Sequence, residues 1–164
     1  MTLRFGILTV SDRSARGERP DASGPALSAR VQAEGWQVAA QAIVPDDFNI
    51  LRGKLSEWAD AGNVDIILTT GGTGFAPRDN TPEATRSIVD REAPGLAEAM
   101  RLASAAKSKH AMLSRAIAGL RGRVLIINLP GSPRGAVENL ETVLPTLEHA
   151  VLLLKEDPKA EAGH

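Results

Sequence analysis

The chain has 164 residues, a formal net charge of −1, no cysteine and no tyrosine, and only 3% of its residues are aromatic. The near-zero charge excludes the basic field that holds nucleic acid or an anionic membrane, and the absence of cysteine excludes disulfides, thiolate zinc sites and a cysteine nucleophile. Because no apolar run approaches the ~20 residues of a membrane span and the length suits one compact domain, we expect a soluble cytoplasmic protein that binds neither nucleic acid nor membranes.

Strand-like and helical patterns alternate along the chain, which is typical of a parallel sheet covered on both faces. Residues 3–10 form a mostly apolar run, as in a buried parallel strand, and a polar loop over 11–23 follows. A helix is expected over 24–34, because a glycine-proline pair opens the segment and a glycine ends it. The next strand is expected over 36–44.

The middle of the chain continues the same alternation. Asp47 is the expected N-cap of a helix over 48–61, whose apolar residues recur at helical spacing. A third strand, 64–70, leads into a glycine-rich loop. Helices are then expected over 82–91 and 94–106.

The last third of the chain predicts a hairpin and a final helix. Two strand-like segments, 113–119 and 123–129, are close enough to pair at a sheet edge. The second ends in NLPGSP, in which Ser132 is an expected N-cap. We therefore expect an α/β fold, a three-layer α/β/α domain over 1–155 with a mostly parallel sheet, and a polar, disordered tail over 156–164.

The most informative segment is 71–83, GGTGFAPRDNTPE, between the third strand and the next helix. Glycines lack a Cβ, so backbone N–H groups can converge on an anion there, and Thr73 adds a hydroxyl donor. A strand, a glycine turn and a helix in this order place the anion at the carboxyl edge of a sheet. Arg78 suits phosphate oxygens and Asp79 suits a divalent cation. The segment therefore indicates phosphate chemistry, with an ordinary tight turn as the structural alternative.

Four loops follow strand ends and are expected to meet at that edge of the sheet. Their carboxylates, guanidinium groups, hydroxyls and helix N-termini suit a substrate with phosphates and a divalent cation. Asp47 is more simply a helix cap, which leaves Asp46 as the ligand candidate, and Asp12 is equally suited to bracing its own loop. The four loops are 11–13, 45–47, 71–79 and 128–132.

Six separated segments carry a family resemblance: TVSDR at 9–13, PD at 45–46, GGTGFAPRDNTPEAT at 71–85, REAPG at 91–95, MLSR at 112–115 and IINLPGS at 126–132. Together they resemble the Mog-type molybdopterin adenylyltransferases of molybdenum-cofactor biosynthesis. Several matches in the right order, covering nearly the whole chain, are far more specific than one glycine loop. One departure is Asn80, where the family usually has valine.

The resemblance implies a reaction in which ATP and molybdopterin give adenylyl-molybdopterin and pyrophosphate, with Mg²⁺. By matching position, Asp46 and Asp79 correspond to the family's essential acidic residues, and the glycine loop corresponds to its nucleotide and pyrophosphate site. Ser114 and the segment 128–132 correspond to parts of its substrate pocket. The resemblance also implies a homotrimer and, as partners, other enzymes of molybdenum-cofactor biosynthesis.

Adenylyl transfer suits a chain that has neither a cysteine nor a histidine cluster. The attacking phosphate monoester has a second pKa of ~6, so it is largely ionised at neutral pH and needs no general base. Positioning and electrostatics then dominate. We expect Asp46 and Asp79 to be the catalytic residues and to hold Mg²⁺. The predicted substrate- and nucleotide-binding residues are Ser11, Asp12, Arg13, Gly71, Gly72, Thr73, Gly74, Arg78, Ser114, Asn128, Pro130, Gly131 and Ser132.

Two other functions stay open on the sequence alone. A non-catalytic member of the same fold would bind molybdopterin or serve as an assembly module, although a pure anion binder gains nothing from two carboxylates. A flavodoxin-like mononucleotide carrier shares the topology class. With no tyrosine and only Phe75 near the loop, however, the chain offers little for an isoalloxazine ring to stack on.

Overall fold

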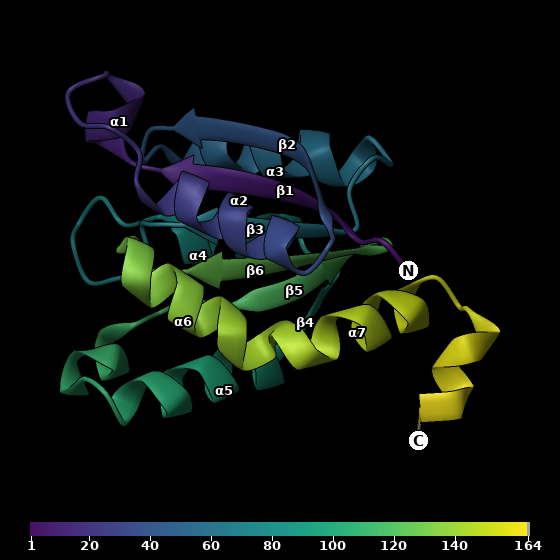
Figure 1. Cartoon of the computed structure of the whole chain (residues 1–164). Helices are drawn as coiled ribbons and strands as arrows, with labels where there is room; N and C mark the ends of the chain where they lie inside the picture. The colour runs from purple at the N-terminus through teal and green to yellow at the C-terminus, as the bar shows by residue number, and fades with distance from the viewer. Residues whose placement is uncertain (164) are drawn as a thin grey trace.

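The computed structural model describes residues 1–163 as a sheet between two layers of helices (Figure 1). The strands are β1 (Arg4–Val10), β2 (Gln37–Val44), β3 (Ile66–Thr70), β4 (Arg91–Glu92), β5 (Ala118–Arg121) and β6 (Val124–Leu129). Their order across the sheet is β2-β1-β3-β6-β5-β4. Strands β2, β1, β3 and β6 run parallel, and β5 and β4 extend the sheet as antiparallel strands. The predicted three-layer α/β/α fold with a mostly parallel sheet is confirmed.

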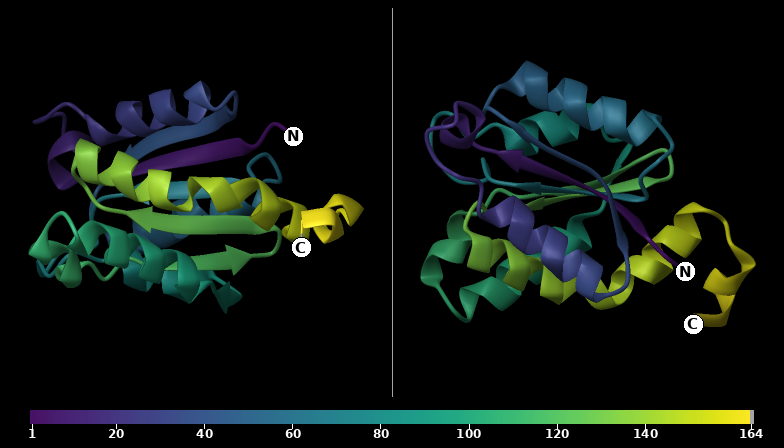
Figure 2. Two further views of the ribbon diagram at one scale, coloured as in Figure 1. Left: turned by 60° about the horizontal axis from the view of Figure 1, so that its bottom comes forward. Right: turned by 45° about the horizontal axis from the view of Figure 1, so that its top comes forward.

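Helices cover both faces of this sheet. The α-helices are α1 (Asp12–Ala15), α2 (Ser23–Ala33), α3 (Phe48–Asp60), α4 (Thr81–Ile88), α5 (Pro94–Ala105), α6 (Pro133–Val143) and α7 (Leu147–Leu154), and the 3₁₀ helices are η1 (Lys109–Leu113), η2 (Leu144–Thr146) and η3 (Pro158–Gly163). Figure 2 shows α3 and α4 on one face and α2, α5 and α6 on the other. The two faces of the sheet therefore each have an apolar core.

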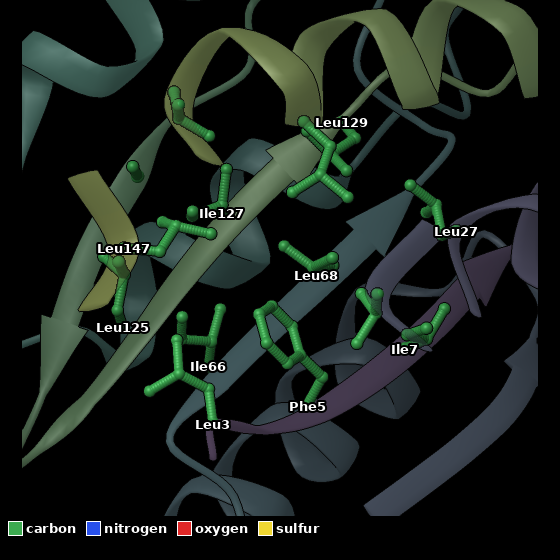
Figure 3. Packing of buried hydrophobic residues seen from close by; sticks show 14 of the residues in the cluster. Leu3, Phe5, Ile7, Leu27, Ile66, Leu68, Leu125, Ile127, Leu129 and Leu147 are labelled. Carbon is green, nitrogen blue, oxygen red and sulfur yellow. The ribbon is translucent and has the colours of Figure 1, made fainter. Parts of the chain in front are cut away.

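Alternation along the strands divides the buried side chains between these two cores. Phe5 of β1 packs beside Ile66 and Leu68 of β3, and Leu27 of α2 lies above Ile7 of β1, as Figure 3 shows. Leu8, three residues further along β1, belongs to the core under α3 and α4. Each fully buried aliphatic side chain contributes about 1.5–3 kcal/mol, so both faces hold the strands in register.

That register aligns the ends of the four parallel strands. Thr9 pairs with Thr70, and Thr70 pairs with Leu129, while Val10 pairs with Val44. The loops that follow these strands therefore leave the sheet at one edge, toward which the arrowheads of β1, β2 and β6 point in Figure 1. This edge is where sequence analysis predicted that the four polar loops would meet.

The predicted hairpin is present, because β5 and β6 pair antiparallel, but its first strand is shorter than predicted. Residues 109–113 form η1, whose N-cap Ser108 accepts a hydrogen bond from the main-chain N–H of His110 at 3.3 Å, and β5 begins only at Ala118. The turn consists of two residues, Gly122, where φ is +54°, and Arg123. A two-residue hairpin turn requires positive φ, which glycine adopts without strain.

Three other boundaries also differ from expectation. The polar loop 11–23 contains the one-turn helix α1, and α4 ends at Ile88, so that β4 can pair with β5. The tail was expected to be disordered, but its residues 158–163 form η3, and Ala160 is only 5% exposed. Asp157 starts η3 by accepting a hydrogen bond from the N–H of Lys159 at 2.9 Å. Residue 164 of the predicted tail lies outside the described residues.

Candidate active site

Asp12 joins the loops that follow β1, β2 and β3. Its Oδ1 accepts hydrogen bonds from the main-chain N–H of Asp46 at 3.0 Å and from Nη2 of Arg78 at 2.9 Å. Its Oδ2 accepts from Nε of Arg78 at 2.5 Å, and Nη2 of Arg78 also donates to the carbonyl of Asp46 at 3.1 Å. The hydrogen bond from Arg78 lowers the pKa of the Asp12 carboxyl, with burial opposing it. Of the two roles considered for Asp12, the geometry favours the brace.

Asp46 has a carboxylate oxygen that the protein leaves unsatisfied. Its Oδ1 is buried and has no hydrogen-bond partner among the described residues. Burial raises the pKa of this carboxyl, and the negative charges of Asp12 and Asp79 raise it further. A buried oxygen among three carboxylates is an environment that a hard cation stabilises. The residues present therefore fit Mg²⁺.

Asp79 lies at the other end of the glycine loop. Its Oδ2 accepts a hydrogen bond from the N–H of Ala76 at 3.1 Å, and its own N–H donates to the Ala76 carbonyl at 2.9 Å. Within residues 1–163, no group of three or more His, Cys, Asp or Glu side chains is arranged to hold a metal ion. A cation here would thus depend on the carboxylates of Asp46 and Asp79, on water and on phosphate oxygens, as Mg²⁺ commonly does.

The glycine loop begins with two residues in the left-handed region. Gly71 has a φ of +107°, and a Cβ there would lie 2.3 Å from the carbonyl oxygen of Val10. Gly72 has a φ of +67°, and a Cβ there would lie 2.4 Å from Oγ1 of Thr81. Thr81 also donates its hydroxyl to the Gly71 carbonyl at 2.9 Å and its N–H to the Gly72 carbonyl at 3.1 Å. The first turn of α4 and the end of β1 thus both require glycine at these positions.

Two cavities flank this loop. The larger, of about 710 Å³, contains the Asp46 side chain and the N-terminal ends of α1, α2 and α6. The smaller, of about 550 Å³, is lined by Thr73 and Gly74 of the loop and by residues of α5 and α6. Ser132, which caps α6 by accepting from the N–H of Gly135 at 3.0 Å, lines both. Among the predicted residues, the larger cavity has Ser11, Asp46, Gly71, Gly72, Gly131 and Ser132, and the smaller has Thr73, Gly74, Ser114, Pro130 and Ser132.

Asn128 does not have the predicted substrate-facing position. Its side chain is fully buried, with Nδ2 donating to the hydroxyls of Thr69 and Thr85 at 3.0 Å each. Its Oδ1 accepts from the N–H of Ile117 at 3.2 Å. Because every polar atom of a buried amide needs a partner, Asn128 links β6 to β3 and α4 beneath the site.

Four other predicted site residues do not line the cavities. Asp12, Arg13, Arg78 and Asp79 line neither of the two cavities, and Arg13 is exposed. Conversely, the cations that line the smaller cavity were not predicted. Arg134 could have been found, because it directly follows the Ser132-Pro133 helix cap. These cations are Arg101, Lys107 and Arg134.

The fold and the site define an α/β protein that gathers a glycine loop, helix N-termini and carboxylates at the carboxyl edge of its sheet, an arrangement typical of phosphate-ligand binding. The family described as a probable molybdopterin binding domain matches residues 6–149. The chain belongs to this family. Among the described residues, none of the helices has the length and apolar character needed to cross a membrane.

Named relatives agree with this assignment. The chain is 42% identical over 158 residues to the molybdenum cofactor synthesis protein cinnamon of Drosophila melanogaster, a match that covers 95% of this chain but only 26% of that protein. It is 39% identical over 156 residues to the molybdopterin adenylyltransferase of Helicobacter pylori strain J99, covering 93% of this chain and 88% of that one. The crystal structure of the molybdopterin biosynthesis enzyme MoaB from Thermus thermophilus is 54% identical, with a TM-score of 0.89 over 96% of this chain and 99% of that chain.

Proposed function

We propose that this chain is a molybdopterin adenylyltransferase that transfers AMP from ATP to the terminal phosphate of molybdopterin. A phosphate oxygen of molybdopterin attacks the α-phosphorus of ATP, and the bond from that phosphorus to the bridging oxygen breaks, so that pyrophosphate leaves. The observation that carries the proposal is the pair of cavities that meet at the glycine loop and at Ser132. An in-line displacement requires the attacking and leaving oxygens on opposite sides of the phosphorus, and two cavities that border different residues of one loop can each hold one of the two substrates.

The larger cavity suits the nucleotide. Its wall includes the main chain of Gly71 and Gly72 and the N-terminus of α6, where the helix dipole favours phosphate. Asp46 and Asp79 would hold Mg²⁺, which supplies charge neutralisation for the departing pyrophosphate. Arg78 holds the two acidic loops together through Asp12 and the Asp46 carbonyl.

The smaller cavity suits molybdopterin. Ala97 and Met100 are apolar lining residues on which a pterin ring can pack, while Arg101, Lys107 and Arg134 are cations for its anionic groups. The bacterial relative named molybdopterin adenylyltransferase matches over most of both chains, which supports the same reaction class here. From the family resemblance alone, we further propose a cytoplasmic homotrimer that works with other enzymes of molybdenum-cofactor biosynthesis.

Pyrophosphate release tests the reaction directly. In the presence of ATP, Mg²⁺ and molybdopterin, we expect Asp46→Asn and Asp79→Asn each to lower the rate about 10²–10³-fold, because each removes charge that positions the cation at the developing negative charge. The matched control is Asp47→Asn. Asp47 caps α3 by accepting from the N–H of Ile50 at 2.9 Å, and asparagine caps helices equally well.

The control separates lost chemistry from lost folding. Asp47→Asn is expected to keep wild-type turnover, and circular dichroism should show all three variants folded. Folded Asp46→Asn and Asp79→Asn variants with unchanged turnover would contradict the assigned roles. A folded wild-type protein that binds molybdopterin but releases no pyrophosphate would instead identify a non-catalytic member of the family.

A further inference from the structure

Arg115, which follows η1 and lies ahead of β5, contacts the glycine loop at both of its ends. Its main-chain N–H donates to the carbonyl of Thr73 at 2.8 Å, and its Nε donates to the carbonyl of Gly74 at 2.7 Å. Its Nη2 donates to the carbonyl of Asp79 at 2.9 Å, and its Nη1 pairs with Oε1 of Glu83 on α4. One guanidinium group therefore connects the beginning of the loop, its end and the following helix.

The loop between these contacts lies on the surface. Residues 75–78 are all exposed, and Phe75 has 67% of its surface exposed. Ordering a backbone residue costs about 1–2 kcal/mol of conformational entropy, so an exposed loop stays in one conformation only if its ends are fastened. Arg78 ties the loop to the segment after β1 through its ion pair with Asp12. Arg115 ties it to the segment before β5.

The chemistry of these contacts requires arginine rather than any cation. The three nitrogens point to two carbonyls and one carboxylate at once, which the planar fork of a guanidinium can do and a single ammonium cannot. Burial alone would raise the pKa of Glu83, but the hydrogen bond from Arg115, a main-chain hydrogen bond and the charges of Arg115 and Arg86 together outweigh it and the pKa is lowered. The pair is thus ionic at neutral pH. Arg115 lines neither cavity, so its nitrogens serve the loop and not a ligand.

We propose that Arg115 is a positioning residue for adenylyl transfer, which holds the glycine loop so that Asp79 faces the carboxylate of Asp46. This role rests on the proposed function, because the geometry matters to turnover only if the two acids cooperate on one cation. Arg115 contacts the Asp79 main chain and leaves its carboxylate free for that task. The Arg115 contacts and the Asp79 carboxylate are separate features of the glycine loop, and Asp46 lies in the loop between β2 and α3.

Kinetics of Arg115→Lys provide the first test. A displacement of about 1 Å at a reacting group can lower a rate about 10²-fold, so we expect kcat for pyrophosphate release to fall by that order, with a much smaller change in KM for ATP. The Mg²⁺ concentration that gives half-maximal rate should rise, because the two acids are no longer held together. In Arg115→Ala, added guanidinium ion should restore part of the rate, whereas added methylammonium should not.

The matched control is Arg121→Lys. Arg121 also joins a carbonyl, that of Ile88 at 2.8 Å, and a carboxylate, that of Asp60 at 2.8 Å, but it lies on β5 away from both cavities. This variant is expected to keep wild-type kcat and the wild-type Mg²⁺ dependence. An equal loss of kcat in both variants would overturn the specific role of Arg115.

Hydrogen exchange tests the clamp without any turnover. The amides of Phe75, Ala76, Arg78 and Asp79 should exchange faster in Arg115→Lys than in the wild type and in Arg121→Lys, while the melting temperatures stay close. Unchanged exchange in this loop, or unchanged kcat in folded Arg115→Lys, would overturn the proposal. A wild-type protein that releases no pyrophosphate would contradict the proposed function instead, and the exchange result would still decide whether Arg115 holds the loop.

Discussion

Gly72 occupies a position where any side chain would enter the candidate cation site. A Cβ there would lie 2.4 Å from Oγ1 of Thr81 and 2.7 Å from Oδ1 of Asp46, on a backbone with a φ of +67°. Gly53 is the opposite case, because it lies on α3 and a Cβ there would meet nothing within 4 Å. Two glycines in one chain therefore differ in whether the fold needs them.

The two alanine variants should change stability in opposite directions. We expect Gly72→Ala to lower the free energy of unfolding by about 1–3 kcal/mol, because it adds backbone strain and a close contact, and to lower pyrophosphate release at least about tenfold. Gly53→Ala should raise the free energy of unfolding by about 0.5–1 kcal/mol, because alanine loses less entropy in a helix. Urea unfolding followed by circular dichroism measures both, and a Gly72→Ala variant as stable and active as the wild type would contradict the first expectation.

At the scale of elements, Asp65 connects the ends of β1, β3 and α7 at the edge of the sheet opposite the site. It is 2% exposed and accepts hydrogen bonds from the N–H of Arg4 at 2.8 Å and from Nη2 of Arg4 at 2.9 Å. Nζ of Lys155, the residue that ends α7, lies 2.9 Å from its Oδ1. Burial by itself would raise the pKa of Asp65, but the hydrogen bonds from Arg4 and Lys155 outweigh it and the pKa is lowered.

Removing this charge should destabilise the protein in a pH-dependent manner. Asp65→Asn is expected to lower the free energy of unfolding at neutral pH by about 1.5–3 kcal/mol, the usual contribution of a hydrogen bond to a charged group. Because the folded-state pKa lies below the unfolded value of about 3.9, the stabilisation is complete above that value and is lost as pH falls through the folded pKa. The free energies of unfolding of the wild type and of Asp65→Asn should therefore differ most above about pH 5 and converge in acid. A constant difference down to acid pH would exclude the linkage.

At the scale of the whole molecule, the candidate site exists only in the assembled sheet. Its loops follow β1, β2, β3 and β6, and its residues extend from Ser11 to Ser132 in the sequence. Parallel pairing aligns these strand ends, and the two cores hold the pairing in register. A ligand that binds all of these loops must therefore stabilise the entire fold.

Thermal unfolding should report this linkage. At a concentration 100 times its dissociation constant, ATP with Mg²⁺ should add about 2.7 kcal/mol to the stability of the wild type and raise its melting temperature. Asp46→Asn should lose most of this gain, whereas Asp47→Asn should keep it. A melting temperature that responds equally to ATP with and without Mg²⁺ would argue against a cation held by Asp46.

Much of the architecture followed from local patterns. The alternation of apolar strands and helices, the caps Asp47 and Ser132, and the glycine loop were all predicted and are present in the structure. The first strand of the predicted hairpin began too early, because Leu113 ends η1 and residues 114–117 form a loop, although their composition resembles that of a short strand. The sequence predicted which loops form the candidate site, but it did not predict which contacts their side chains make.

The turns and helix caps of the backbone could be predicted from the residue pattern alone, because those features depend on residues a few positions apart. The supporting role of Asn128 in the sheet, the contacts of Asp12 with two loops and those of Arg115 with the glycine loop became visible only in the folded chain. Asp12 lies 34 residues from Asp46 and 66 from Arg78, Arg115 lies 41 residues from Gly74, and Asn128 lies 59 residues from Thr69. Which distant carbonyl or carboxylate a side chain reaches depends on how strands and helices pack, and no local pattern contains that information.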